Sequence, residues 1–345
     1  MMRSPSPQVI TAGSKRIAVT TEARAGSPGA GAQVQSAVAR GPSIAFAPDR
    51  WWSRVLFTCF GWRLFVRSMR RLAEAPGDLP LEACAQLQRD VGASLLRHLR
   101  VQLEFHGLSN LPRCPHVVVA LHEGLADVLA LSQLPLTMRM VAREEILDWP
   151  WIGPALRRMG HLGIEPEHGA ASYRRLIAAA EKTLRAGAHV VLFPQGAVLG
   201  IETAFQPGAF RLARLLRAPI LPIVVTGAHR IWEHPFSPCV RYGQRVGIAV
   251  LPPVSATDVA RCTPDSLQSR LQRQMKAVAL SGCLPEPRHY APQRDGFWDG
   301  FAFDIDEAFP EILAAVEHHR AIRARISAAA VHRSATPGTV EPSRT

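Results

Sequence analysis

One histidine and one aspartate, five residues apart, form the pair in this sequence that is most suited to chemistry. His122 and Asp127 lie in the stretch Leu121-His122-Glu123-Gly124-Leu125-Ala126-Asp127, which directly follows the apolar run Val117-Val118-Val119-Ala120. An imidazole beside a carboxylate that fixes its tautomer and stabilises its cation can act as a general base on a hydroxyl. The chain has 13 histidines, so such a spacing also arises by chance, and the rest of the sequence has to support it.

The spacing of the pair indicates where each residue lies. Successive helical residues are rotated by about 100°, so residues five apart do not share a helix face. We therefore expect His122 in a loop after a strand and Asp127 on the first turn of the next helix, with Gly124 allowing the chain to bend. The competing interpretation is a solvated loop histidine and an aspartate that only interacts with a helix N-terminus.

Three further segments follow the pair in a characteristic order. They contain Val141-Ala142-Arg143-Glu144-Glu145-Ile146 with Trp149-Pro150-Trp151-Ile152-Gly153, then Leu192-Phe193-Pro194-Gln195-Gly196, then Pro219-Ile220-Leu221-Pro222-Ile223-Val224. Together with the His122 segment they resemble the glycerolipid acyltransferases of the 1-acyl-glycerol-3-phosphate acyltransferase type, over about residues 100 to 255. The order and spacing of the segments are more specific than any one of them.

The resemblance implies a reaction and a set of site residues. A fatty acyl group would pass from an acyl thioester, on coenzyme A or acyl carrier protein, to the hydroxyl of a lyso-lipid in membrane lipid synthesis. His122 would be the general base and Asp127 would orient it, with no metal and with no cofactor other than the acyl-CoA or acyl-ACP co-substrate. The thioester is already activated, so no covalent acyl-enzyme is required. The implied substrate-binding residues are Arg143, Phe193, Pro194, Gln195, Gly196 and Ala197, with backbone amides near Gly196 as candidates for stabilising an oxyanion.

The chain departs from the family pattern mainly at residues that read the acceptor. The family's Asn, Ser, Glu, Thr and Arg are replaced here by Leu121, Gly124, Gln195, Ala197 and Val198. Either the acceptor lacks a glycerol phosphate group, as a lyso-aminolipid does, or its phosphate is held by Arg143, Arg157, Arg158 or Arg211. Loss of activity is a third alternative, and it corresponds to a non-catalytic lipid-binding relative of the family.

The periodicity of apolar residues predicts alternating strands and helices. We expect strands over 101–105, 116–121, 137–142, 189–193, 219–225 and 246–250, and helices over 126–134, 172–184, 208–216 and 265–280, with Ser172 as a helix cap. Repeated strand–helix crossovers predict an α/β fold with a largely parallel mixed sheet covered by helices. In such sheets, ligands bind beyond the carboxyl ends of the strands, where His122 and Pro194 would both lie.

Composition limits the classes of partner. The chain has 345 residues, of which 47% are hydrophobic, and a net charge of +12. This charge favours a phospholipid surface, a nucleic acid or an acidic carrier protein, although genome composition explains it equally well. Nucleic acid is disfavoured because the arginines are dispersed and only 3 tyrosines are available for stacking. The 6 cysteines are scattered and predict neither a metal site nor a disulfide framework.

The chain divides into five predicted regions. Residues 1–48 and the tail 329–345 are rich in small and polar residues, and we expect both to be disordered. Residues 101–284 are the acyltransferase domain, and 285–328 are a C-terminal extension whose role the sequence leaves open.

We expect residues 49–100 to form two amphipathic helices that precede the catalytic domain and associate with a membrane. Trp52, Leu56, Phe60 and Leu64 recur at helical spacing, and Arg63, Arg67, Arg70 and Arg71 follow toward the carboxyl end. No stretch is long and apolar enough to span a bilayer, so we expect a peripheral or monotopic protein at the cytoplasmic face of the membrane. The alternative is that both helices simply pack on the domain core.

Overall fold

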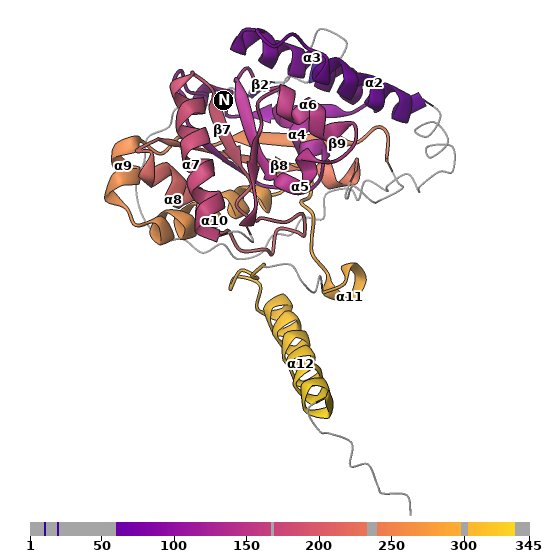
Figure 1. Ribbon diagram of the computed structural model, residues 1–345, viewed down its shortest axis with the longest axis vertical. Coiled ribbons are helices and arrows are strands. Elements are labelled where there is room, and N and C mark those ends of the chain that lie inside the picture. The colour runs from indigo at the N-terminus through magenta and orange to yellow at the C-terminus, as the bar shows by residue number, and fades with distance from the viewer. Residues whose placement is uncertain are drawn as a thin grey trace, which may run out of the picture.

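A computed structural model describes residues 10–11, 19–20, 60–166, 169–232, 240–297 and 303–334, with side chains as far as 327. The main body is a sheet covered on both faces by helices (Figure 1), and the distal part of the C-terminal helix extends away from it. The predicted α/β architecture is therefore confirmed.

Seven strands form the sheet in the order β3-β9-β8-β4-β7-β5-β6. All neighbouring pairs are parallel except β8 and β9, which are antiparallel. The sheet is thus the largely parallel mixed sheet that the sequence predicts. The strands are β3 Gln102–His106, β4 Val117–Ala120, β5 Met138–Arg143, β6 Leu162–Ile164, β7 His189–Leu192, β8 Ile220–Thr226 and β9 Arg245–Val250.

Two further strands of two residues each, β1 (Ile10–Thr11) and β2 (Val19–Thr20), pair with β3. They fall inside residues 1–48, whose composition predicts disorder. The pairing is understandable because β3 is the last strand of the seven and would otherwise present unpaired backbone groups. The rest of residues 1–48 lies outside the described residues.

Both faces of the sheet are buried, as alternation along β4 shows. Val117 and Val119 belong to a core cluster with Phe210 and Leu271, while Val118 and Ala120 belong to another on the opposite side. Helices Ala126–Leu131, Gly169–Arg185 and Gly208–Leu215 lie in crossover connections between parallel strands, whereas Leu81–His98 precedes the first of the seven strands and Pro264–Ala279 follows the last. The helices are α2 Trp62–Ala73, α3 Leu81–His98, α4 Ala126–Leu131, α5 Glu144–Leu147, α6 Ile152–Arg158, α7 Gly169–Arg185, α8 Gly208–Leu215, α9 Ala256–Arg261, α10 Pro264–Ala279, α11 Pro292–Asp295 and α12 Pro310–Ser334, with short 3₁₀ turns η2 Leu108–Asn110 and η4 Ala228–Arg230.

The register of β4 and β7 places two predicted site segments side by side. Val119 pairs with Leu192 in the parallel ladder, so the chain leaves both strands at the same edge. Phe193 comes directly after β7, and His122 is the second residue after β4, so both lie at the carboxyl edge where parallel sheets bind ligands.

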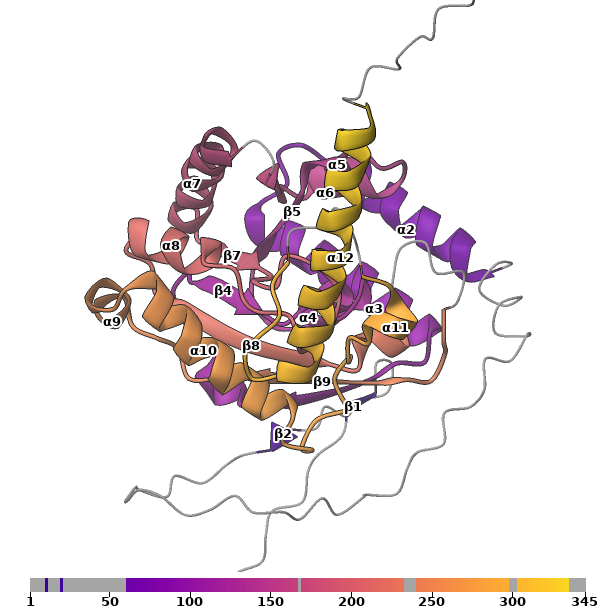
Figure 2. The same cartoon turned by 90° about the horizontal axis from the view of Figure 1, so that it is seen from below.

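Helices α2 and α3 pack against the body through their apolar faces. Phe65, Met69 and Leu72 are buried in one cluster with Ala155 and Met159 from the region of α6. The outward face of α2 carries the arginines at 63, 67, 70 and 71, all exposed. Figures 1 and 2 show α2 and α3 on the opposite side of the body from α9 and α10. The predicted interfacial residues Trp52 and Leu56 lie outside the described residues.

The C-terminal extension docks on the body through apolar residues at its described positions. Tyr290, Phe303 and Ile305 are buried in a cluster with Leu199, next to the Pro194-Gln195-Gly196 segment. Lys276 of α10 is 4% exposed and donates to the backbone oxygen of Thr203 at 2.9 Å and to Asp306 at 2.6 Å. The extension is therefore continuous with the packing of the predicted acyltransferase domain.

Candidate active site

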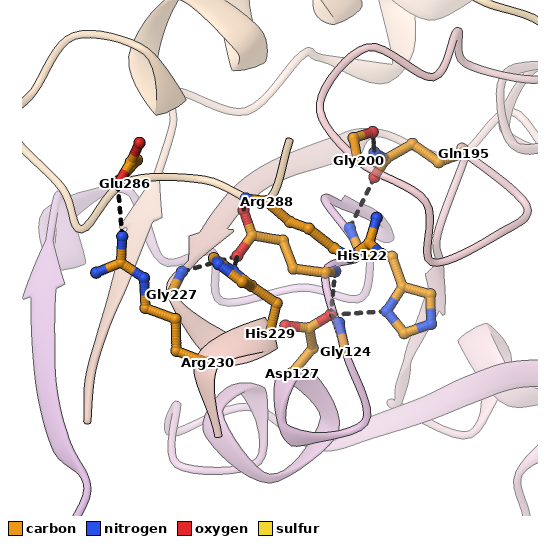
Figure 3. Close-up of polar contacts among 11 residues, drawn as sticks. His122, Gly124, Asp127, Gln195, Gly200, Gly227, His229, Arg230, Glu286 and Arg288 are labelled. Carbon is orange, nitrogen blue, oxygen red and sulfur yellow. Dashed lines mark hydrogen bonds and ion pairs between the residues drawn. The ribbon is translucent and has the colours of Figure 1, made fainter. Parts of the chain in front are cut away.

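His122 and Asp127 form a hydrogen-bonded pair at the carboxyl edge of the sheet (Figure 3). The distance from Nδ1 of His122 to Oδ2 of Asp127 is 2.7 Å. The His122 side chain is 18% exposed and the Asp127 side chain is fully buried. His122 lies in the loop after β4 and Asp127 on the first turn of α4, the arrangement that the five-residue spacing predicts.

The Asp127 carboxylate is fixed by the loop that carries His122. Besides the imidazole, its Oδ2 accepts from the backbone amides of Glu123 at 2.6 Å and Gly124 at 3.0 Å. The two backbone amides can only donate, so Oδ2 serves them as an acceptor, and we assign the proton of the third contact to Nδ1 of His122. Nε2 is then the nitrogen with a lone pair, which is what a general base requires.

Close packing, as well as the bend of the loop, requires a glycine at position 124. A Cβ at this position would come within 2.7 Å of the backbone oxygen of Trp232 and 3.3 Å of the Cα of His229. The backbone of the loop after β4 therefore packs directly against the backbone of the turn after β8, with no side chain between them. This contact accounts for a glycine where the resembled family has a serine.

Phe193, the residue after β7, supports the imidazole of His122 from one side. The two ring centroids are 4.1 Å apart and the ring planes are inclined by 22°. Stacking at this distance limits rotation of the imidazole and excludes water from that face. Phe193 thus lies where the resemblance places a substrate-binding residue, in direct contact with the proposed base.

Gln195 is buried and joins two loops. Its side-chain oxygen accepts from the backbone amide of His122 at 2.7 Å, and its side-chain nitrogen donates to the oxygen of Gly200 at 2.9 Å (Figure 3). The residue is only 1% exposed. Both ends of the amide are used, so this side chain holds the active-site loops together.

The other predicted binding residues occupy the same edge in different ways. Arg143 ends β5 and donates to Glu145 at 2.9 Å, with 30% of its side chain exposed. Pro194 is buried, and Gly196 has a φ of +70° and donates its amide to the oxygen of Phe193 at 3.1 Å. Ala197 packs against the buried cluster of the C-terminal extension.

Three of the arginines considered for an acceptor phosphate have other positions. Arg157 pairs with Asp148 on the surface, and Arg158 donates to the backbone oxygen of Ala75, near α2. Arg211 is exposed on α8. Of the four candidates, Arg143 is the one at the end of a strand on the His122 edge.

Glu123 is a buried residue of the site that the sequence did not single out. It is 3% exposed, and its carboxylate accepts from the backbone amides of Gly227 at 2.7 Å and Arg288 at 3.0 Å and contacts Nδ1 of His229 at 3.0 Å. Burial raises the pKa of Glu123 well above its ordinary value, and the charge of Asp127 raises it further. No group of three or more metal-binding side chains occurs among the described residues.

Comparison with known proteins finds a family and several relatives with similar sequences. Residues 102–226 match the family described as Acyltransferase. The 1-acyl-sn-glycerol-3-phosphate acyltransferase of Pseudomonas aeruginosa is 26% identical over 159 residues, 45% of this chain and 60% of that protein. The protein of the same name from Bacillus subtilis is 29% identical over 133 residues, 37% of this chain and 65% of that protein. The matches thus span less than two thirds of these relatives.

A solved structure shares the fold. The crystal structure of the 1-acyl-sn-glycerophosphate (LPA) acyltransferase PlsC from Thermotoga maritima superimposes with a TM-score of 0.50 at 16% identity, over 66% of this chain and 90% of that one. This likeness establishes the shared fold, an α/β sheet covered by helices. Residues 102–226 thus match the Acyltransferase family, and the resemblance of the sequence to the phospholipid and glycerol acyltransferase family is confirmed.

Proposed function

We propose that this protein transfers a fatty acyl group from acyl-CoA or acyl-ACP to the hydroxyl of a lyso-lipid, with His122 as the general base. The observation that carries the proposal is the 2.7 Å contact between Nδ1 of His122 and buried Asp127, which leaves Nε2 to take a proton. The relatives' names describe acylation of 1-acyl-glycerol-3-phosphate, which supports the same reaction class.

The chemistry requires one proton transfer and one acyl transfer. As the acceptor oxygen attacks the thioester carbonyl, Nε2 of His122 takes its proton, and Asp127 stabilises the imidazolium that forms. Collapse of the tetrahedral intermediate breaks the carbon–sulfur bond, and the imidazolium returns the proton to the leaving thiolate. The ester and the free thiol of the carrier are the products.

The acceptor is proposed to differ from 1-acyl-glycerol-3-phosphate. Val198 stands where the family has an arginine, and it cannot grip a phosphate as a guanidinium does. Arg158 contacts the Ala75 backbone and Arg157 pairs with Asp148. Arg143 lies at the His122 edge, but its guanidinium is paired with Glu145 at 2.9 Å. A lyso-lipid without a terminal phosphate, such as a lyso-aminolipid, fits better beside the apolar side chain of Val198.

Attachment to the membrane is proposed to use the outer face of α2. Trp62 is 42% exposed and Trp151 is 41% exposed, and Arg70 lies over the Trp151 ring at 5.4 Å from its centroid. Exposed arginines beside indole rings fit the headgroup layer of a bilayer. None of the described helices is long and apolar enough to cross a membrane. We therefore propose a peripheral or monotopic protein, at the cytoplasmic face where acyl-CoA and acyl-ACP are found.

The function is tested by supplying one donor and one acceptor at a time. Purified protein is incubated with acyl-CoA or acyl-ACP and a panel of lyso-lipids, and thiol release is followed together with formation of the diacyl product. Acceptor-dependent release from either donor supports the proposal. Binding of lyso-lipid without thiol release from either donor would instead support the non-catalytic lipid-binding alternative.

A further inference from the structure

Two buried glutamates hold the same short segment of the C-terminal extension. Glu123, 3% exposed, accepts from the amide of Arg288 at 3.0 Å, and Glu202, 4% exposed, accepts from the amide of Tyr290 at 2.7 Å. Each carboxylate also contacts the Nδ1 atom of a histidine, His229 for Glu123 at 3.0 Å and His289 for Glu202 at 2.7 Å. The two glutamates are alike in burial and bonding, but only Glu123 belongs to the His122 loop.

The segment completes a closed chain of hydrogen bonds around the proposed base. The amide of His122 donates to Gln195, and Gln195 donates to the oxygen of Gly200. The amide of the next residue, Ile201, donates to the oxygen of Arg288 at 2.8 Å. The amide of Arg288 then returns to the carboxylate of Glu123, the neighbour of His122. Figure 3 shows Arg288 and Gln195 on two sides of the His122 loop.

The approach of the segment is close enough to require a glycine. A Cβ at Gly200 would come within 2.4 Å of the amide nitrogen of Tyr290. The extension therefore packs backbone to backbone against the loop that follows Gln195. Residues 288–290 lie outside residues 102–226, the part of the chain that matches the family.

We propose that Glu123 is a positioning residue for the His122–Asp127 pair, which it fastens to the C-terminal extension at Arg288 and to the turn at Gly227 and His229. The inference rests on the proposed function of His122. The amide of Glu123 donates to the same Asp127 oxygen that holds the imidazole, so its backbone and side chain link the pair directly to both neighbouring segments. A buried carboxylate that accepts such bonds fixes the loop, since each donor would otherwise be left unsatisfied.

The test compares Glu123→Gln and Glu123→Ala with Glu202→Gln and Glu202→Ala in the full chain. We expect Glu123→Gln to lower kcat by about tenfold, because the amide cannot accept from all three donors. Glu123→Ala should lower kcat by about a hundredfold, the scale of an ångström-sized displacement of a catalytic group. KM for the acyl donor should change by less than about threefold. Both Glu202 variants should keep kcat within about threefold of wild type while losing thermal stability as the Glu123 variants do.

A second measurement does not depend on turnover. The rate at which diethyl pyrocarbonate modifies His122, followed by peptide mass spectrometry, reports how firmly the loop is held. It should rise in Glu123→Ala and stay at the wild-type value in Glu202→Ala. Equal loss of kcat in the two alanine variants, or an unchanged His122 modification rate in Glu123→Ala, would overturn the positioning role. A wild-type protein that releases no thiol would instead contradict the proposed function and leave the modification result to judge the positioning of the loop.

Discussion

The ring of Phe193 lies against the imidazole of His122, with 4.1 Å between the two ring centroids. The contact joins the ends of two neighbouring parallel strands and sets the plane of the proposed base. We expect Phe193→Ala to lower kcat by about fivefold, since an aromatic pair contributes about 1 kcal/mol beyond its buried area. Steady-state thiol release measures the effect.

Phe193→Tyr is the matched control because it keeps the stacked ring. It should restore most of the wild-type kcat. An alanine variant as active as wild type would show that the ring only fills space.

Substituting Val198, which stands where the family has an arginine, should change the preferred acceptor lipid. Val198→Arg provides a guanidinium that can bind a phosphate with charge-assisted hydrogen bonds, so the ratio of rates for 1-acyl-glycerol-3-phosphate over a zwitterionic lyso-lipid should rise by about tenfold. Val198→Gln, which is long but uncharged, should leave the ratio unchanged. Wild-type protein that already prefers 1-acyl-glycerol-3-phosphate over every other lyso-lipid would refute the altered acceptor.

Restoring the family's glutamate at Gln195 should be harmful in this chain. A carboxylate there still accepts from the amide of His122, but it places an oxygen against the oxygen of Gly200, where the Gln195 nitrogen now donates. We expect Gln195→Glu to lower the free energy of unfolding by about 1–3 kcal/mol, measured by denaturant titration. An unchanged midpoint would mean that the loop rearranges.

The exposed arginines of α2 should govern binding to anionic vesicles. Replacing Arg63, Arg67, Arg70 and Arg71 by Gln should weaken binding, because each basic residue near an anionic surface contributes about 1 kcal/mol. The control changes the same charge on the opposite side of the body, at the exposed residues Arg214, Arg261, Arg270 and Arg273. Co-sedimentation should fall for the α2 variant alone, and equal losses would indicate that only net charge matters.

Acid should destabilise the fold through His189. Burial, together with the neighbouring His116, lowers the pKa of His189 to about 4. In the unfolded chain His189 is protonated below about pH 6.5, whereas in the folded chain it stays neutral down to about pH 4. Its contribution to stability is therefore present above about pH 6.5 and is lost as the pH falls toward 4. Over this window the loss is about 3 kcal/mol. His189→Asn keeps an acceptor for the His116 amide, and its unfolding free energy should depend less on pH; parallel curves would contradict this.

The sequence predicted the central elements because their burial is continuous or strictly periodic. The apolar run that contains β4 is buried on both faces, and Leu267, Leu271 and Met275, which recur at helical spacing on the predicted helix over 265–280, are all fully buried. Strand β6 was missed because its three residues are only half-buried and form no apolar run. The predicted cap Ser172 was wrong. Helix α7 begins at Gly169, and the hydroxyl of Ser172 instead accepts from the amide of Glu165 in the preceding loop.

The site was predictable only where its contacts are local. His122 and Asp127 are five residues apart, and a strand end followed by a helix start brings them together. Glu123 takes its partners from Gly227 and Arg288, which are 104 and 165 residues away. Such contacts depend on how distant loops meet, and no local pattern signals them. The docking of Tyr290 beside the active-site loop could not be predicted from the sequence for the same reason.

The most direct test of the central claim is the turnover of His122→Ala. General-base catalysis contributes at least about a hundredfold, so the account predicts a loss of kcat of that size, with Asp127→Asn also strongly impaired. His106→Ala serves as the control, since β3 runs opposite to β4 and ends at the far edge of the sheet. It should retain wild-type turnover. A folded His122→Ala protein that transfers acyl groups at nearly the wild-type rate would contradict the account.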